Sequence, residues 1–449
     1  MNAYLFATLM TLFLLVAGCS IPGTADGGLS GTADENPAVR IGNGYGRGMT
    51  PDPQVAVDAS GNALAIWAYD DGMGINTYAC RYEAASGWGN AEKIEDNERR
   101  RSVGQQIAFD SNGNAMAVWS RFDGTVLSIW ANRYTAGSGW QDEELIETDD
   151  RGDAVRPQIV IDHNDNAWVV WSQHNGTTGR IYANRYEAGR GWQGAREIQS
   201  LTTGLAGHAV AAVDPMGNVV VVYTISEAGM WNIRALFYDA ACGRWESEVL
   251  LEKDDTDFAR EPQVACDAAG NFIAVWYQND QIRANRYSAG NGWGEAELVG
   301  DEPGMAIKPA IACDAAGHAV VVWYQESGSG TVYNVWANRY TPGSGWGEAE
   351  LLETDDAGDA GSPHVAANAA GEFVVVWSQN ESRDFEPVST IWSRRVTPGG
   401  GWEEACMLEK RIEYHRSQLP RVAIADNGAA VAVWYQTDDS GRNIWACSF

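Results

Sequence analysis

Two loops of this 449-residue chain each carry three aspartates within five residues, in the segments ETDDRGDA and ETDDAGDA. The residues are Asp149, Asp150, Asp153, Asp355, Asp356 and Asp359. Carboxylate oxygens are the hard ligands that Ca²⁺ takes in proteins, so each loop could hold one calcium ion. Neither loop has the full D-x-D-x-D-G pattern of a calcium-binding loop, so a solvated polar loop without metal is the alternative.

Amide, imidazole and guanidinium side chains recur at one position, four residues before a repeated aspartate or its counterpart. They are Gln54, Gln106, Gln158, Gln263, His364 and Arg421, and two further repeats hold Val210 and Ala310 there. We expect this position at the mouth of each innermost strand of a ring. Polar groups that converge on a channel form a typical ligand site. We therefore interpret them as ligand-binding residues at the channel mouth.

Both sets belong to a repeat that is visible through its aromatic residues. The anchor residues, which end apolar runs such as ALAIW, are Trp67, Trp119, Trp171, Tyr223, Trp276, Trp323, Trp377 and Trp434. They are spaced by 47 to 57 residues, and an Asp lies nine residues before the anchor in six of the eight units. Asn368 and Ala425 take its place in the last two. A gap that never varies indicates a turn of fixed length between two paired strands.

Each unit is predicted to contain four strands. A first strand such as PQVAVD leads through a D-x-x-G-N turn to a second strand that is apolar on both faces, as in a sheet sandwiched between layers. IWANRY is typical of the third strand, and a Gly-rich turn leads to GWGEAELLE as the fourth. Four-stranded units of this length in series indicate an all-β fold, an eight-bladed β-propeller.

The two ends of the repeat array complement each other. The last unit stops at NIWACSF without a fourth strand, whereas NPAVRIG precedes the first unit. We predict that Ala38–Ile41 pairs with the last unit and closes the ring, which would remove its exposed edges. An open solenoid of sheets is the alternative.

The chain begins with MNAYLFATLMTLFLLVAGCS, whose apolar run is shorter than the roughly 20 residues that span a bilayer. This pattern indicates an export signal, and its end, Val16-Ala17-Gly18-Cys19, resembles the lipobox of bacterial lipoproteins. The resemblance implies cleavage before Cys19 and acylation of Cys19, with palmitate for example, and Ser20 after it implies the outer membrane. We thus expect a signal peptide over residues 1–18, a lipid-anchored flexible linker over 19–37 and the propeller over 38–449. An ordinary secretory signal is the alternative.

The remaining composition limits the partners. A formal charge of −29 disfavours binding to nucleic acid, since phosphate backbones would be repelled. The other six cysteines show no CxxC spacing, so we expect small buried thiols rather than disulfides or metal ligands. We expect a monomer.

Aromatic and basic side chains also recur in the outer strands. Tryptophans at the anchors and at the start of the fourth strands are expected in the core, with stacking on a sugar ring as the alternative. A recurring arginine is expected to form a buried fork with turn carboxylates or carbonyls, with an anion site as the alternative. These arginines are Arg81, Arg133, Arg185, Arg286, Arg339 and Arg395.

The architecture resembles the sialidase-like propellers, but their S-x-D-x-G-x-x-W box is not matched here. Their Arg-Ile-Pro signature is absent as well, since Gly42 follows Arg40-Ile41. The chain most resembles the uncharacterised Trp-rich repeat lipoproteins of bacterial envelopes, a resemblance that implies no known activity. We expect a lipid-anchored, non-catalytic module that binds a glycan, peptide or protein. A sialidase-like glycoside hydrolase or lyase, and a structural component of an envelope complex, are the alternatives.

Overall fold

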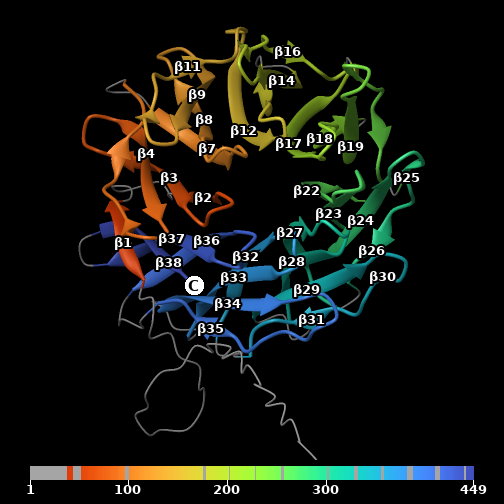
Figure 1. Ribbon diagram of the computed structural model, residues 1–449. Helices are drawn as coiled ribbons and strands as arrows, with labels where there is room; N and C mark the ends of the chain where they lie inside the picture. Colours follow the sequence, from red (N-terminus) through yellow and green to blue (C-terminus); the bar gives the residue numbers. More distant parts are fainter. Residues whose placement is uncertain are drawn as a thin grey trace, which may run out of the picture.

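The computed structural model describes most of the repeat region. The described residues are 38–43, 52–96, 101–174, 178–201, 203–227, 229–253, 257–300, 303–327, 332–354, 358–381, 388–409, 415–438 and 441–449. They form an all-β structure without helices, so no helix in this part of the chain is long and apolar enough to cross a membrane. The successive units follow one another around a central axis (Figure 1).

Three long strands build each unit, numbered here 1 to 8 in chain order. The first strands, nearest the axis, are β2 (Gln54–Val57), β7 (Arg101–Phe109), β12 (Asp153–Ile161), β17 (Leu205–Val213), β22 (Arg260–Cys266), β27 (Ala306–Cys313), β32 (Ala360–Ala367) and β36 (Arg416–Ile424). The second strands are β3 (Ala63–Asp70), β8 (Ala115–Phe122), β13 (Ala167–His174), β18 (Val219–Glu227), β23 (Phe272–Gln278), β28 (Ala319–Glu326), β33 (Phe373–Asn380) and β37 (Ala430–Asp438). The third strands are β4 (Ile75–Glu83), β9 (Leu127–Thr135), β14 (Gly179–Glu187), β19 (Met230–Asp239), β24 (Gln281–Ser288), β29 (Tyr333–Thr341), β34 (Ser389–Val396) and β38 (Gly441–Ser448).

The fourth strand is not continuous as the sequence predicted. It consists of two short pieces on the third strand, because the GW pair and the EL pair contact it separately. The first pieces are β5 (Gly87–Trp88), β10 (Gly139–Trp140), β15 (Gly191–Trp192), β20 (Arg244–Trp245), β25 (Gly292–Trp293) and β30 (Gly345–Trp346). The second pieces are β6 (Glu92–Lys93), β11 (Glu144–Leu145), β16 (Arg196–Glu197), β21 (Val249–Leu250), β26 (Glu297–Leu298), β31 (Glu350–Leu351) and β35 (Cys406–Met407).

The strand predicted over residues 38–41 is β1 (Val39–Asn43), and it pairs antiparallel with β38 of unit 8. Ile41 is buried in a cluster that joins Trp67 of unit 1 to Ile444 of unit 8. The Trp67 indole N–H donates to the carbonyl of Asn43 over 2.9 Å, and a Cβ on Gly42 would lie 2.2 Å from the Trp67 ring. β1 is therefore packed against both ends of the repeat array.

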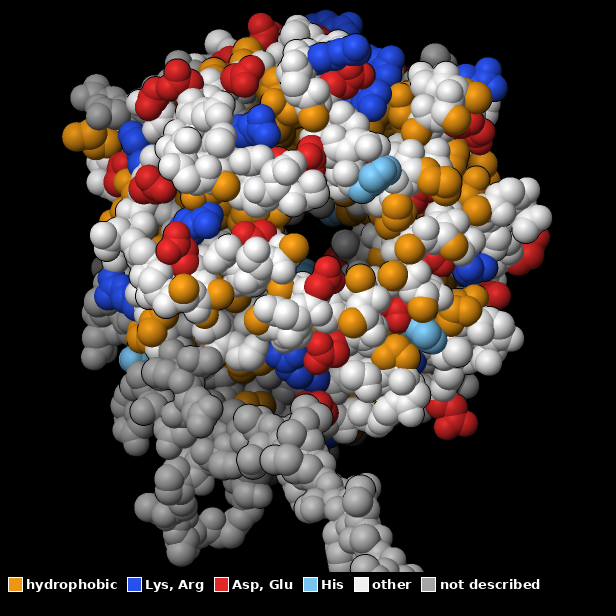
Figure 2. Space-filling view, in the orientation of Figure 1, with side chains coloured by type: hydrophobic (Ala, Val, Ile, Leu, Met, Phe, Trp, Pro, Cys, Tyr) orange, Lys and Arg blue, Asp and Glu red, His pale blue; other side chains and the backbone are white. Residues whose placement is uncertain are grey.

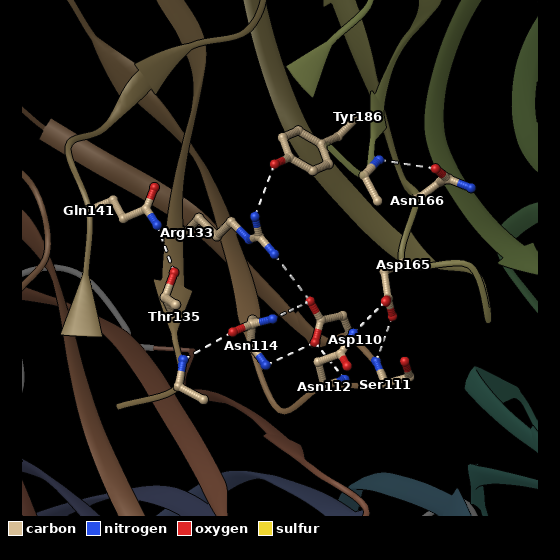
Figure 3. Close-up of polar contacts among 12 residues, drawn as sticks. Asp110, Ser111, Asn112, Asn114, Arg133, Thr135, Gln141, Asp165, Asn166 and Tyr186 are labelled. Atoms are coloured by element: carbon tan, nitrogen blue, oxygen red, sulfur yellow. Dashed lines mark hydrogen bonds and ion pairs between the residues drawn. The ribbon is translucent and has the colours of Figure 1, made fainter. Parts of the chain in front are cut away.

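The turn between first and second strands is held by its aspartate, as the fixed spacing predicted. Asp110 accepts hydrogen bonds from the backbone N–H groups of Asn112 and Asn114, each over 2.9 Å, and from the Asn114 side chain (Figure 3). The Asn114 amide oxygen in turn accepts the N–H of Ala136, after the third strand, over 3.0 Å. The aspartate thus shapes the turn, and the asparagine ties it to the next turn of the same unit.

The core lies between adjacent units. The anchor tryptophans are buried, with at most 1% of each side chain exposed, which confirms their predicted place. The recurring arginines match the predicted fork in part, because Arg395 donates to the carbonyls of Gly428 and Phe449, each over 2.9 Å. Several also stack on the ring that ends the third strand of the next unit. Arg133, for example, lies 5.6 Å from the Tyr186 ring centroid and donates to its hydroxyl over 3.1 Å. Only some also reach a turn carboxylate, as Arg133 reaches Asp110 over 3.4 Å.

A buried glutamate, which was not predicted from the sequence, follows the outer strand in several units. Glu95 accepts hydrogen bonds from the Thr77 N–H and, over 2.8 Å, from the Ser102 hydroxyl. Burial raises its pKa. In unit 2 its neighbour is Arg121, 1% exposed, whose guanidinium lies 3.6 Å from Glu95, pairs with Glu143 and covers the Trp130 ring at 3.5 Å. Units 3 and 5 to 8 have Gln at the Arg121 position, and units 1 and 4 have Tyr69 and Ile225.

All six cysteines in the described residues are free. Cys80 and Cys447 are buried, and Cys266, Cys313 and Cys406 are partly buried, in accord with the prediction. Cys242 differs because it lies on an exposed turn.

Candidate functional site

The first strand breaks its register at the same place in units 2 to 8. In β12, for example, regular pairing with β13 stops at Val155 and resumes at Gln158. The break is a β-bulge, which re-aims side chains and bends the strand. One bulge residue in each of these units has a positive φ, between 49° and 68°. These residues are Gly104, Arg156, His208, Glu261, Lys308, Ser362 and Leu419.

Six of those seven residues are not glycine, although positive φ costs a residue with a Cβ about 1–2 kcal/mol. Proline follows the bulge residue in most units and needs no partner there, because it has no N–H to leave unpaired. These prolines are Pro157, Pro262, Pro309, Pro363 and Pro420. Strained positions of this kind cluster at functional sites, which directs attention to what the bulges surround.

The bulges surround a central cavity of about 410 Å³. The hollow is visible at the centre of the molecule in Figure 2. All six predicted channel residues line it, namely Gln54, Gln106, Gln158, Gln263, His364 and Arg421. Six of the seven bulge residues line the same wall. Leu419 is apolar, and the other five add charge and polarity, namely Arg156, His208, Glu261, Lys308 and Ser362.

The placement of the predicted residues needs one correction. They were expected at the mouth of each innermost strand, but Gln158 is the sixth residue of β12, immediately after the bulge. The strands begin earlier than the alternating pattern suggested, because the segment before the bulge also pairs with the second strand. The predicted residues that follow a bulge therefore lie within their strands, whereas Gln54 begins β2, as predicted.

The charged groups of this cavity are largely engaged. Arg421 pairs with Asp52 over 2.9 Å, and Glu261 accepts the backbone N–H of Lys308 over 2.9 Å. Asp52 and Glu261 are the carboxylates among the described lining residues, and they belong to units 1 and 5. The arrangement offers many hydrogen-bond donors and acceptors but no adjacent pair of lining carboxylates for acid–base chemistry.

Both histidines of the cavity are held neutral. Desolvation, together with the nearby Arg421, lowers the pKa of His364 to about 3. Desolvation and Arg156 lower the pKa of His208 to about 4, and its imidazole contacts the Arg156 guanidinium. At neutral pH each ring has one acceptor and one donor nitrogen. His364 Nδ1 accepts the Val422 N–H over 3.4 Å and His208 Nε2 faces the Arg156 guanidinium, so the remaining N–H of each ring is its donor.

We expect the stability to fall as the pH is lowered from about 6.5 towards 3. The reference pKa of histidine is about 6.5, so the unfolded chain binds more protons than the folded protein in this window. The His364 contribution is present above pH 6.5 and lost as the pH approaches the folded value of about 3. Urea unfolding of wild type and His364→Gln from pH 7 to pH 4 checks this. The variant is expected to lose stability less steeply, and equal slopes would contradict the assignment.

In the first acidic loop, as in the rest of the chain that the structure describes, no group of three or more His, Cys, Asp or Glu side chains is placed to hold an ion. Asp149 binds the Arg151 guanidinium and the Tyr182 hydroxyl, the latter over 3.0 Å. Asp153 accepts the Leu127 N–H over 2.9 Å. Asp150 is exposed. The aspartates are thus used by their own loops and neighbouring strands.

The second acidic loop is only partly described. Asp359 accepts the Tyr333 N–H over 3.0 Å, just as Asp153 accepts the N–H that begins the third strand of the preceding unit. Asp355 and Asp356, like the lipidation residue Cys19, lie outside the described residues.

The sequence matches no protein-family model and no curated protein. Among solved structures, the BP39L lectin from Burkholderia pseudomallei is 10% identical with a TM-score of 0.53, covering 80% of this chain and 99% of the lectin. A PL25 ulvan lyase, bound to -[GlcA(1-4)Rha3S]-, is 10% identical with a TM-score of 0.51, covering 91% of this chain and 95% of the lyase. The NanB sialidase from Streptococcus pneumoniae is 9% identical with a TM-score of 0.38, covering 92% of this chain and 70% of the sialidase. At such identities the lectin and the lyase show a propeller-like fold and nothing further.

Proposed function

We propose that this protein is a carbohydrate-binding module of the bacterial cell envelope, anchored by a lipid on Cys19 in the outer membrane. In this proposal the eight units form an eight-bladed propeller that β1 closes, residues 19–37 are the tether, and a glycan enters the central cavity. The observation that carries the proposal is the ring of polar side chains on strained bulges around that cavity. Strain is retained where it serves a site.

The chemistry of the ring suits sugar hydroxyls. Gln106, Gln158 and Gln263 each present an amide that donates and accepts. Neutral His364, whose Nδ1 accepts the Val422 N–H over 3.4 Å, adds a further donor. Hydroxyl groups also both donate and accept. The two carboxylates of the wall are engaged with Arg421 and with a backbone N–H, which favours binding over hydrolysis. The lectin of similar fold is consistent with this class of ligand.

The test is a glycan array with residues 36–449, followed by titration calorimetry on the best ligand. The double variant Gln106→Ala/Gln158→Ala is expected to bind about tenfold or more weakly, because each lost hydrogen bond is worth roughly 0.5–1.5 kcal/mol. The matched control is Gln193→Ala, whose side chain is exposed on the outer part of unit 3. Unchanged affinity in the double variant, or no binding to any glycan, would refute the central site.

The same array run in EDTA addresses calcium. We expect binding to persist, because Asp149, Asp153 and Asp359 already accept hydrogen bonds from the protein. Loss of binding in EDTA would instead support the calcium site first suggested by the two acidic loops.

One observation favours the enzyme alternative, a lyase or glycoside hydrolase. A polar cavity of about 210 Å³ in unit 3 is lined by Asp149, Tyr182 and Arg180, and Arg180 pairs with Glu197 over 3.3 Å. The ulvan lyase of similar fold acts on a polysaccharide. Release of new reducing ends from a panel of polysaccharides, lost in Tyr182→Phe, would establish this alternative in place of the binding module.

A further inference from the structure

A second cavity, of about 360 Å³, lies between units 6 and 7 and shares no lining residue with the central cavity. Its volume falls in the range of small-ligand sites, about 300–1,000 Å³. Its wall includes the apolar side chains of Phe373 and Val396, the ring of Trp346, and the polar side chains of His318 and Arg339. Thr341, Ser344 and Thr397 add hydroxyl groups.

The cavity occupies the place of an aromatic ring that the other units have. The last residue of the IWANRY motif is aromatic in seven units, and the residues are Tyr82, Tyr134, Tyr186, Tyr238, Tyr287, Tyr340 and Phe449. Unit 7 alone has an aliphatic residue there, Val396. In several units the residue just before this position stacks on the corresponding ring of the next unit, as Arg81 does on Tyr134 at 5.0 Å and Arg286 on Tyr340 at 5.7 Å.

Arg339 is the arginine that faces this gap. Because the next unit offers Val396 instead of a ring, its guanidinium donates to the Gly400 carbonyl over 2.7 Å and pairs with Glu350 over 2.7 Å. About a third of the Arg339 side chain remains exposed. A guanidinium has five N–H donors, so it can keep these contacts and still donate to a guest.

His318 is a second departure from the repeat at the same cavity. Units 1 to 5 have Asn at this position, and its amide oxygen accepts an N–H after the third strand, as Asn114 accepts that of Ala136. In unit 6 the residue that would supply this N–H is Pro342, which has none. The position is thereby freed from this hydrogen bond, although its side chain still contacts the turn aspartate, as Asn114 contacts Asp110.

The histidine is also oriented. Its Nδ1 lies 2.8 Å from the carboxylate of Asp314, which is 2% exposed, while 28% of the His318 side chain remains exposed. A carboxylate that holds one ring nitrogen fixes the orientation of the other. His318 therefore presents its Nε2 edge in a fixed direction on the cavity wall.

The lining selects among ring-shaped guests. A purely aromatic guest would fill the place of the missing ring but would offer no hydrogen-bond partner to the Nε2 edge of His318 or to the remaining N–H groups of Arg339. A pyranose has apolar C–H faces for Trp346, Phe373 and Val396, and hydroxyls for the imidazole, the guanidinium and the threonines. The combination of an aromatic wall with a few placed polar groups is typical of small-molecule sites.

We propose that the cavity between units 6 and 7 is a second carbohydrate site, which takes one neutral pyranose ring in the place of the missing tyrosine. The inference rests on the proposed carbohydrate function and extends it to a site outside the central channel. Trp346 and Val396 bound the sugar ring, and Arg339 and His318 bind its hydroxyls.

The key variant is Val396→Tyr, which restores the ring of the other units and fills the cavity. The fold is expected to accept it, because unit 5 already places Tyr287 beside Phe272, with centroids 5.9 Å apart, where unit 7 has Val396 beside Phe373. Val249→Tyr makes the same chemical change on an exposed strand and is the matched control. His318→Ala tests the site without filling it.

Binding is measured by saturation-transfer NMR with the methyl glycosides of glucose, galactose, mannose and N-acetylglucosamine. The background is the central-site variant Gln106→Ala/Gln158→Ala, so that the two sites are read separately. We expect residual binding of at least one glycoside, about tenfold weaker with His318→Ala and abolished by Val396→Tyr, but unchanged by Val249→Tyr.

The outcomes separate this inference from the proposed function. Residual binding that Val396→Tyr leaves intact overturns the second site. If the background variant, without any further substitution, binds no glycoside, the second site is also overturned and the central site is supported. If the background variant binds at full strength and Val396→Tyr abolishes that binding, the second site is supported and the central site is refuted. No binding of any glycoside to the wild type overturns the inference.

Discussion

Replacing Ile41 with Ala is expected to destabilise the protein by about 2–5 kcal/mol, the usual loss for a buried aliphatic side chain cut to Ala. Ile41 is 6% exposed in the cluster shared by units 1 and 8. The loss should be accompanied by self-association, because a loosened β1 uncovers the edge of β38 and unpaired edges recruit other chains. Urea unfolding followed by fluorescence, with light scattering of the folded sample, measures both effects.

Val39 on the same strand provides the control. Its side chain is 39% exposed, so Val39→Ala should change the stability by no more than about 0.5 kcal/mol. Equal small losses in the two variants would show that β1 does not hold the ring together and would favour the open arrangement of sheets.

Arg121→Ala is expected to cost about 3–5 kcal/mol, the range found when one partner of a buried ion pair is removed. The guanidinium lies between Glu95 and Glu143 and covers the Trp130 ring. Removing it would leave two carboxylates without their counter-ion and a gap over the indole. The measurement is the free energy of unfolding in urea at pH 7.

Arg121→Gln is the matched variant, because Gln is the residue of other units at this position. In unit 3, Gln173 lies beside the equivalent Glu147, with Nε2 and Oε2 3.4 Å apart. The repeat thus already pairs Gln with this glutamate, and we expect a loss of only about 1 kcal/mol. If Arg121→Ala were no worse than Arg121→Gln, the ion pair would contribute little.

The repeat itself predicted much of the fold. A constant spacing between Asp110 and Trp119, and between their equivalents, indicated a turn of fixed length, and the structure has that turn, with the aspartate accepting its N–H groups. The unpaired N-terminal strand was predicted from the missing fourth strand of unit 8, and β1 pairs there. Both predictions concern local patterns, which a sequence records directly.

The geometry of the candidate site was harder to predict. A bulge leaves the alternation of apolar and polar residues intact before it and after it, so the pattern does not reveal it. The positive φ angles belong to residues such as Arg156 and Lys308, and no glycine marks these positions. The available signal was the proline that follows, Pro157 or Pro309, because proline inside a strand marks an edge or a bulge.

The buried glutamates and the second cavity depend on contacts between neighbouring units. Nothing in the sequence distinguishes Glu95 from the many other acidic residues, and only the structure places it beside Arg121. Val396 reads as an ordinary β-strand residue until the ring that it replaces is seen in the adjoining units. The residue types recur in the sequence, but their roles come from contacts between units that only the structure shows.

The pairing of β1 with β38 also makes the starting point of the chain arbitrary. Val39 lies opposite Ala446 in an antiparallel pair, so residue 38 and Phe449 continue past each other at the same end of the sheet. A linker of a few residues would join them as a hairpin, and the chain could then be opened between β21 and β22. Circular permutation of this kind would move the termini to another sector of the ring while keeping every strand pair.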